Sequence, residues 1–272
     1  MAWTESTALG QATAYGRTYD PGLLCPLDRR EGRRQLGLGD ALPFHGVDIW
    51  RNYEVSWLDA LGKPVVAIAN LEVPAASPFL IESKSLKLYF NGLNFTRFSG
   101  PDDVITVVSR DLSAAAGVPV RVTLFQSTVS PGPSEMPGVC LDMLTPDIRH
   151  YHPEPGLLKT TGGPSVREVL HSHLLRSNCP VTGQPDWGSV AICYEGAPID
   201  HAGLLAYVVS FREHNDFHEQ CVERMFHDLM ARCRPEKLTV FACYTRRGGL
   251  DINPFRSNWE LSPATVPRLA RQ

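Results

Sequence analysis

The chain has 272 residues, of which 43% are hydrophobic and 20% are charged, and its formal net charge is −3 at pH 7. This length is enough for one large domain or two smaller ones, each with a packed core. The slightly acidic balance gives no overall basic field, which argues against a nucleic-acid-binding protein.

The chain also lacks the patterns of export and membrane insertion. Its first residues, "MAWTESTALGQATAYGRTYD", contain no basic stretch followed by an apolar run. No window approaches the roughly 18 apolar residues that a membrane span needs. We therefore expect no membrane contact. The seven cysteines are odd in number and form no CxxC pair, so we also expect reduced thiols and a cytoplasmic location.

Residues 1–45 form an irregular N-terminal extension, and residues 46–125 form the first predicted module. This module begins with the strand-like "GKPVVAIANLEVP" and continues with "FLIESKSLKLYF", interpreted as a second strand with "ESKSLK" at its head. "PDDVITVVSRDLSAAAG" follows with apolar residues at helical spacing. Its aspartates are expected to cap a helix that stops at Gly117.

Residues 126–160 are rich in Pro, Ser and Gly and are predicted to be a linker. The second module, residues 161–272, begins with the strand-like "DWGSVAICYEG". Later in this module Phe217, Cys221, Met225 and Leu229 recur every four residues, which predicts a helix that Pro235 ends. The apolar "KLTVFACYT" then predicts a buried strand.

The two modules repeat one another. Three first-module segments match second-module segments about 120 residues later, in the same order: "VAI" in both modules, "FLIESKSLKLYF" with "APIDHAGLLAYV", and "VTLF" with "LTVF". Each module therefore reads strand, strand, helix, strand. The predicted class is α+β, with antiparallel sheets.

A thiol and a carboxylate lie close together in "LRSNCPVTGQPDWGSV". Cys179 precedes a turn-rich stretch, and Asp186 follows seven residues later. One interpretation is a packed cysteine and an ordinary turn aspartate. The other is a nucleophile with its proton donor, which suits addition to a C≡N or C=N bond better than acyl transfer.

Three further segments carry charged residues that also have a plausible structural role. In "DFHEQC", Asp216 and Glu219 fit a helix capping box. This structural role does not explain the histidine at position 218. "ESKSLK" is either a solvated strand end or part of a site. In "TRRGGLDINPFRSN", Arg246 and Arg247 beside two glycines suit either phosphate binding or a solvated hairpin.

The sequence contains no complete motif for binding a nucleotide or a metal ion. "LGLGDAL" lacks the third glycine and the preceding strand of a dinucleotide-binding turn, and there is no GxxxxGK[ST]. Histidines occur in the pairs "HYH" and "HSH" and as His214 with His218, which would share a helix face only if the helix began by His214. No cysteine or carboxylate stands at a convincing spacing for a third ligand, so no metal site is predicted.

Five segments in order resemble one known family: "FHGVDIW", "IESKSLKLYFNGLNFTRF", "RSNCPVTGQPDWGS", "SFREHNDFHEQC" and "RRGGLDINPFRSN". They are similar to the long, two-module form of the NADPH-dependent 7-cyano-7-deazaguanine reductases, the nitrile reductases of queuosine biosynthesis. The resemblance runs from about residue 43 to residue 260. It implies tandem tunnelling-fold modules with helices packed on one face of the sheets, and a homodimer.

The resemblance also implies roles for single residues. Cys179 matches the nucleophile that forms a covalent thioimide, and Asp186 matches the general acid and base. The expected substrate residues are Glu82, Ser83, Lys84, His218 and Glu219, with His218 also in the catalytic set. The expected NADPH residues are Lys84, Ser85, Arg246, Arg247 and Gly248. Because the second module has "DHAG" where the first has "ESKS", and only the second has the cysteine, one composite site per chain is expected.

The implied reaction is the two-hydride reduction of the nitrile of 7-cyano-7-deazaguanine to an aminomethyl group, with dissociable NADPH and no metal. Two alternatives stay open. A zinc-dependent cyclohydrolase of the same fold would use the histidine pairs and a cysteine as ligands. A non-catalytic purine- or pterin-binding module would keep Glu82 and Glu219 but would not need Cys179.

Overall fold

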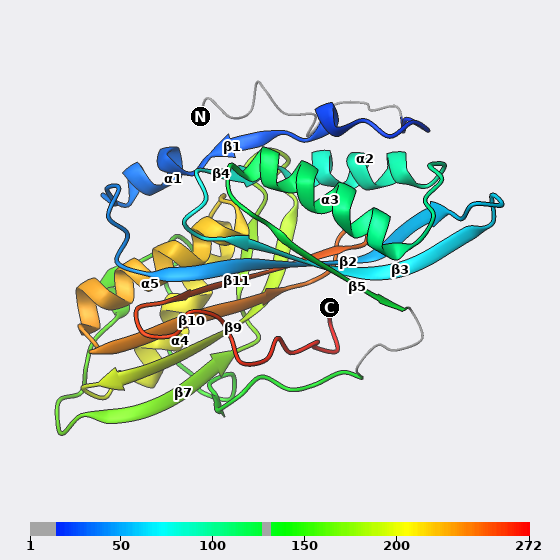
Figure 1. Ribbon diagram of the computed structural model, residues 1–272. Helices are drawn as coiled ribbons and strands as arrows, with labels where there is room; N and C mark the ends of the chain where they lie inside the picture. The colour runs from blue at the N-terminus through cyan, green and yellow to red at the C-terminus, as the bar shows by residue number, and fades with distance from the viewer. Residues whose placement is uncertain (1–14, 127–131) are drawn as a thin grey trace. The chain divides into compact units, whose positions relative to one another are not determined.

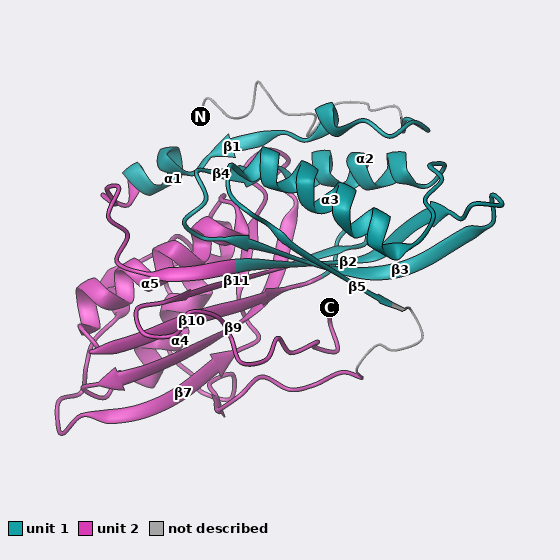
Figure 2. Ribbon diagram, viewed as in Figure 1, with its two compact units in different colours: residues 1–34, 48–131, 246–251 teal, residues 35–47, 132–245, 252–272 magenta. Residues whose placement is uncertain are grey.

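A computed structural model describes residues 15–126 and 132–272 of the chain. Residues 1–14 and 127–131, which belong to the expected N-terminal extension and linker, lie outside the described part. The chain folds into two compact units (Figure 2). Unit 1 comprises residues 1–34, 48–131 and 246–251, and unit 2 comprises residues 35–47, 132–245 and 252–272.

Unit 1 contains a three-stranded antiparallel sheet covered on one face by two helices (Figure 1). The sheet order is β5-β3-β2, and the short strands β1 and β4 form a separate antiparallel pair. The elements are β1 (Pro26–Asp28), α1 (Arg29–Gln35), β2 (His45–Leu58), β3 (Pro64–Pro74), β4 (Phe79–Ile81), α2 (Ser83–Leu93), α3 (Pro101–Ala116) and β5 (Arg121–Gln126).

Unit 2 contains a larger sheet in the order β11-β10-β9-β7-β6, with β8 paired to β9 beside this path. All of these neighbours are antiparallel except β6, which runs parallel to β7. The elements are β6 (Val139–Cys140), β7 (Val166–Ser172), β8 (Arg176–Asn178), β9 (Pro185–Gly196), α4 (His201–Ser210), α5 (His218–Cys233), β10 (Lys237–Tyr244) and β11 (Leu250–Ser257). Helix α5 packs against β10, whose residues are buried after the first.

The long helices follow the predicted periodicity. Helix α3 buries Val104, Val108 and Leu112 and ends at Gly117 in the left-handed conformation. Its N-cap is Gly100, so the aspartates do not cap it as expected. They lie in its first turn, where negative charge favours the helix dipole. Helix α5 ends at Cys233, two residues before Pro235.

The second strand expected in each module is wrong, because "ESKSLK" begins a helix. Glu82 accepts hydrogen bonds from the second and third backbone N–H groups beyond it, and Asp200 does the same at the start of α4. A carboxylate N-cap of this kind stabilises the first helical turn. Leu86, Tyr89 and Leu93 then lie buried at helical spacing, and only β4 remains of the expected strand.

A buried tyrosine–aspartate hydrogen bond joins two helices in each unit, α2 to α3 and α4 to α5. Tyr89 of α2 donates to Asp111 of α3 at 2.8 Å, and Tyr207 of α4 donates to Asp228 of α5 at 2.7 Å. The same bond therefore recurs at equivalent positions of the two sequence repeats. Each unit is a sheet with a helix pair, and the predicted α+β class is confirmed.

Both units include short segments from elsewhere in the chain. In unit 2, the Phe44 ring packs edge-on against Phe226 with centroids 5.4 Å apart. Gly46 follows, and a Cβ there would lie 1.9 Å from the Phe255 carbonyl oxygen, so only glycine fits. In unit 1, the Tyr53 hydroxyl donates to Asp251 at 2.6 Å.

No helix in the described ranges, residues 15–126 and 132–272, is both long and apolar enough to span a lipid bilayer.

Candidate active site

Cys179 lies where β8 leaves its pairing with β9. Ser177 pairs with Asp186 in this hairpin, and beyond the strand the Cys179 N–H donates to the Gln184 carbonyl at 2.9 Å. Cys179 follows Ser177 by two residues, just beyond the end of β8, and Asp186 lies opposite Ser177. Cys179 and Asp186 are both buried, with exposed fractions of 3% and 7%.

The start of helix α5 is tied to the same hairpin. The Asn178 N–H donates to the His214 carbonyl at 2.8 Å, and the Asp216 N–H donates to the Asn178 carbonyl at 3.1 Å. This connection places His218, the first residue of α5, with its Nε2 3.3 Å from Asp186 Oδ2. The first turn of a helix also favours nearby negative charge. The structure thus brings a carboxylate, an imidazole and a helix N-terminus together.

The end of β10 supplies Tyr244, which sequence reasoning assigned only to a buried strand. Its ring lies under His218, with centroids 3.9 Å apart and planes 31° apart. Burial, with the Cys221 thiol as the next cause, raises the pKa of Tyr244, so the phenol stays neutral. Its position beside the site depends on strand pairing, so nothing in the local sequence pattern distinguishes it from a core tyrosine.

Two polar atoms next to this group lack an oxygen or nitrogen hydrogen-bond partner among the described residues. They are the hydroxyls of Ser177 and Tyr244, and both lie beside the Cys221 thiol. Most buried polar atoms in proteins do have such a partner. Both hydroxyls therefore have the Cys221 thiol as their polar neighbour in the packed interior.

Glu219 is buried in the first turn of α5, with an exposed fraction of 3%. The capping box expected from Asp216 and Glu219 is wrong, because the N-cap is Phe217 and Asp216 precedes it. Asp216 Oδ1 instead accepts from the Phe217 N–H at 3.0 Å. His214 lies before the helix and contacts Asp216 at 3.4 Å, so His214 and His218 do not share a helix face.

The "ESKS" residues lie in unit 1, at the start of α2. Glu82 has an exposed fraction of 1% and accepts from the N–H groups of Lys84 at 2.6 Å and Ser85 at 2.7 Å. The Ser83 hydroxyl lies 3.5 Å from the same carboxylate. Burial raises the pKa of Glu82, against the opposing effect of these N–H donors.

Arg246, Arg247 and Gly248 also belong to unit 1, in the turn between β10 and β11. The Arg246 guanidinium lies 4.1 Å from the centre of the Tyr53 ring. The Arg247 N–H donates to the Leu250 carbonyl at 2.9 Å, and Gly248 takes a φ of 59°, which favours glycine. These three residues form a tight turn with two guanidinium groups.

Gly248 lines a cavity of about 240 Å³ within unit 1. The cavity lining mixes apolar and polar side chains, with one cation, Lys87 of helix α2, and one carboxylate, Glu54 of β2. Its lining residues are Tyr15, Asn52, Glu54, Lys87, Phe90, Asn91, Asn94, Gly248 and Leu250.

Comparison with known proteins places the chain in a family. Residues 15–124 match the family described as nitrile reductase, 7-cyano-7-deazaguanine-reductase N-term, and residues 185–262 match the QueF-like protein family. The chain is 55% identical to the NADPH-dependent 7-cyano-7-deazaguanine reductase of Chromohalobacter salexigens, over 98% of this chain and 97% of the relative. It is 54% identical to the protein of the same name from Dechloromonas aromatica, over 99% and 96%.

Among solved structures, the apo archaeosine synthase QueF-Like aligns with 37% of this chain and 98% of its own, at 18% identity and a TM-score of 0.32.

The matched sequence families define the class of the protein as a nitrile reductase. The chain belongs to the NADPH-dependent 7-cyano-7-deazaguanine reductase family.

Proposed function

We propose that the protein reduces the nitrile of 7-cyano-7-deazaguanine to the aminomethyl group of 7-aminomethyl-7-deazaguanine, with NADPH as reductant, in queuosine biosynthesis. The observation that carries the proposal is the position of Cys179 directly after the strand that pairs with Asp186, with His218 3.3 Å from that carboxylate. The names of the full-length relatives support the substrate and the cofactor. They do not favour the zinc cyclohydrolase.

In the proposed mechanism the Cys179 thiol adds across the C≡N bond. The C–S bond forms as the nitrile nitrogen takes up a proton, which gives a covalent thioimide. Asp186 carries that proton to the nitrogen, and His218 holds the carboxylate in place. NADPH, when bound, supplies the two hydrides. After the first reduction the C–S bond breaks, Cys179 recovers its proton, and the resulting imine is reduced to the amine.

We assign substrate binding to Glu82, Ser83, Lys84, His218 and Glu219. Glu82 and Glu219 are buried carboxylates, and a deazaguanine presents N–H donors that need such acceptors. The raised pKa of Glu82 shows that its charged form is short of solvation, so N–H donors from a ligand would stabilise it further.

We assign NADPH binding to Lys84, Ser85, Arg246, Arg247 and Gly248. The cavity next to Gly248 fits part of such a ligand, since Lys87 can pair with a phosphate and the Glu54 carboxylate and asparagine side chains can accept from or donate to ribose hydroxyls. At about 240 Å³ it is smaller than the roughly 300–1,000 Å³ of a site that encloses a whole drug-sized ligand, so it would hold only part of the dinucleotide.

The cofactor assignment predicts that Arg247→Ala raises the KM for NADPH, because a guanidinium contact to phosphate is lost. Formation of the Cys179 adduct without NADPH should stay at the wild-type rate. Steady-state kinetics and intact-mass kinetics measure these two quantities. An unchanged KM would remove Arg247 from the cofactor site.

The central test is covalent capture of the substrate. Mixed with 7-cyano-7-deazaguanine and no NADPH, the protein should gain the mass of one substrate per chain, mapped by peptide analysis to Cys179. Cys179→Ala should lose both the adduct and NADPH-dependent turnover. Cys193→Ala is the matched control, because Cys193 is a half-buried cysteine of β9, and it should keep both. Full turnover by Cys179→Ala would overturn the mechanism and favour a non-catalytic binding module.

The same measurement tests the proton donor. Asp186→Asn keeps the shape of the side chain but cannot deliver a proton. It should slow adduct formation by about two to four orders of magnitude, the usual effect of losing a positioned acid. Adduct formation at the wild-type rate would exclude Asp186 as the acid.

We also propose a cytoplasmic homodimer, as the resemblance to the two-module reductases implies. Seven cysteines without a CxxC pair agree with a reducing compartment. Light scattering should give twice the chain mass of 30.1 kDa. A mass of one chain at micromolar concentration would exclude the dimer.

A further inference from the structure

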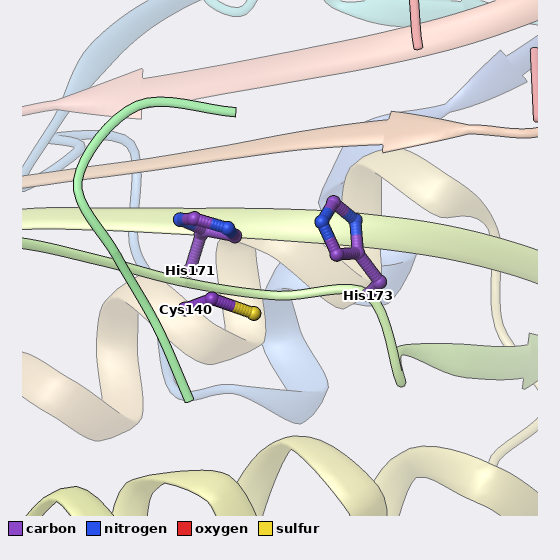
Figure 3. Close-up of side chains that lie close together, drawn as sticks. All are labelled: Cys140, His171 and His173. Carbon is purple, nitrogen blue, oxygen red and sulfur yellow. The ribbon is translucent and has the colours of Figure 1, made fainter. Parts of the chain in front are cut away.

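A cysteine and two histidines outside the residues assigned to the reaction lie together in unit 2 (Figure 3). Strand β6 runs parallel to β7, which sets Cys140 opposite His171. His173 comes two residues after His171 along the chain, just beyond the end of β7. The ligand atoms of the three side chains all lie within 4.8 Å of one another.

Both imidazole rings are held in place by hydrogen bonds to Nδ1. His171 Nδ1 lies 2.9 Å from the Pro137 carbonyl, which can only accept, so Nδ1 carries the proton and Nε2 keeps its lone pair. His173 Nδ1 lies 2.8 Å from the Ser189 hydroxyl. In metal sites, hydrogen bonds of this kind fix the ring orientation of the histidine ligands. When the Ser189 hydroxyl accepts from Nδ1 of His173, Nε2 of that ring is the nitrogen left for the metal.

The backbone around the cluster is also fixed. The Asp142 carboxylate accepts from the His173 N–H at 3.0 Å and from the Ser172 hydroxyl at 2.6 Å. The two imidazole centroids are 5.1 Å apart. Cys140 is exposed, so an ion can reach the group from solvent.

We propose that Cys140, His171 and His173 bind one Zn²⁺ ion, with a fourth coordination position open to solvent. One thiolate and two imidazoles are ligands that zinc prefers, and three protein ligands with one open position are a known arrangement. Bond lengths of about 2.0–2.3 Å place the ligand atoms of tetrahedral zinc about 3.3–3.7 Å apart. Binding therefore requires the ligand atoms, which lie within 4.8 Å of one another, to move closer together by up to about 1–1.5 Å.

The test is titration of metal-free protein with Zn²⁺ alone, followed by calorimetry. Using Cys179→Ala as the parent removes the proposed nucleophile as a competing thiol. One equivalent of Zn²⁺ per chain is expected. Co²⁺ should give a thiolate-to-metal charge-transfer band, since cobalt replaces zinc in such sites and reports the Cys140 sulfur directly.

Variants of the two less buried ligands decide the outcome. Cys140→Ser and His173→Ala should each weaken Zn²⁺ binding at least tenfold, and Cys140→Ser should abolish the cobalt band. The matched controls are Cys193→Ser in β9 and the exposed His152→Ala, and both should bind as the parent does. The parent's failure to bind one equivalent, or parent-like affinity in Cys140→Ser and His173→Ala, would overturn the proposal.

Discussion

Glu82 and Asp200 hold the same local role in the two repeats, yet we assign only Glu82 to the substrate. Each carboxylate caps a helix by accepting two backbone N–H groups. Glu82 is almost fully buried and its pKa is raised by that burial, whereas Asp200 is half-buried. The pair therefore allows the capping role of Glu82 to be separated from its proposed binding role.

Glu82→Leu and Asp200→Leu should each lower the free energy of unfolding by about 0.5–2 kcal/mol, because each removes an N-cap. Of these two variants, only Glu82→Leu should weaken substrate binding, by about 1.5–3 kcal/mol for a lost hydrogen bond to a charged group. Glu219→Leu should weaken binding in the same range. Calorimetry in a Cys179→Ala background measures affinity without covalent capture.

Normal affinity in Glu82→Leu, or an equal loss in Asp200→Leu, would show that Glu82 has a structural role only.

At the scale of elements, the helix pair of each unit is joined by one tyrosine–aspartate hydrogen bond, but the two bonds have different surroundings. Asp111 also accepts from Tyr19 at 2.6 Å and pairs with Arg110 at 2.8 Å. Asp228 has, besides Tyr207, a contact to His227 at 3.2 Å. The carboxylate in unit 1 therefore keeps stronger partners when its tyrosine is lost.

Tyr207→Phe should lower the free energy of unfolding by about 1–3 kcal/mol, because it leaves a buried carboxylate oxygen without its donor. Tyr89→Phe should lower it by only about 0.5–1.5 kcal/mol, since Tyr19 still donates to the same oxygen of Asp111. Urea unfolding of both variants measures the difference. A larger effect in Tyr89→Phe would contradict this account of the two bonds.

The elements also show how far sequence reasoning reaches. Local patterns predicted α3 and α5 well, because an apolar residue every three or four positions is typical of an amphipathic helix. The start of α2 was misread, since an apolar run next to "ESKS" fits a strand until Glu82 is seen as a cap. Cys140 was not recognised as a partner of His171, because their proximity depends on parallel pairing of two segments about 30 residues apart.

At the scale of the whole molecule, the candidate site was predicted mainly from the five segments that resemble a known family. The chemistry of single residues contributed less. The residues of "RSNC" and "DFHE" proved to be neighbours within unit 2, which no local pattern required. Tyr244 was missed because an aromatic residue at the end of an apolar strand looks like core.

Each unit depends on residues from the other half of the sequence. Unit 2 needs Phe44 and Gly46, which pack on Phe226 and Phe255, and unit 1 needs the turn that carries Asp251. Fragments 1–131 and 132–272, produced separately, should therefore lack cooperative unfolding transitions. Thermal and urea unfolding measure this, with the intact chain as control. A cooperative transition in either fragment alone would contradict the expected dependence.

The turn at residues 246–251 belongs to unit 1 although most of that unit is complete by residue 131. During synthesis the ribosome adds roughly 5–20 residues per second, and domains generally fold as they emerge, the N-terminal one first. Here the last piece of the first unit is translated after nearly all of the second. We therefore expect unit 1 to complete its folding only after residue 251 has left the ribosome.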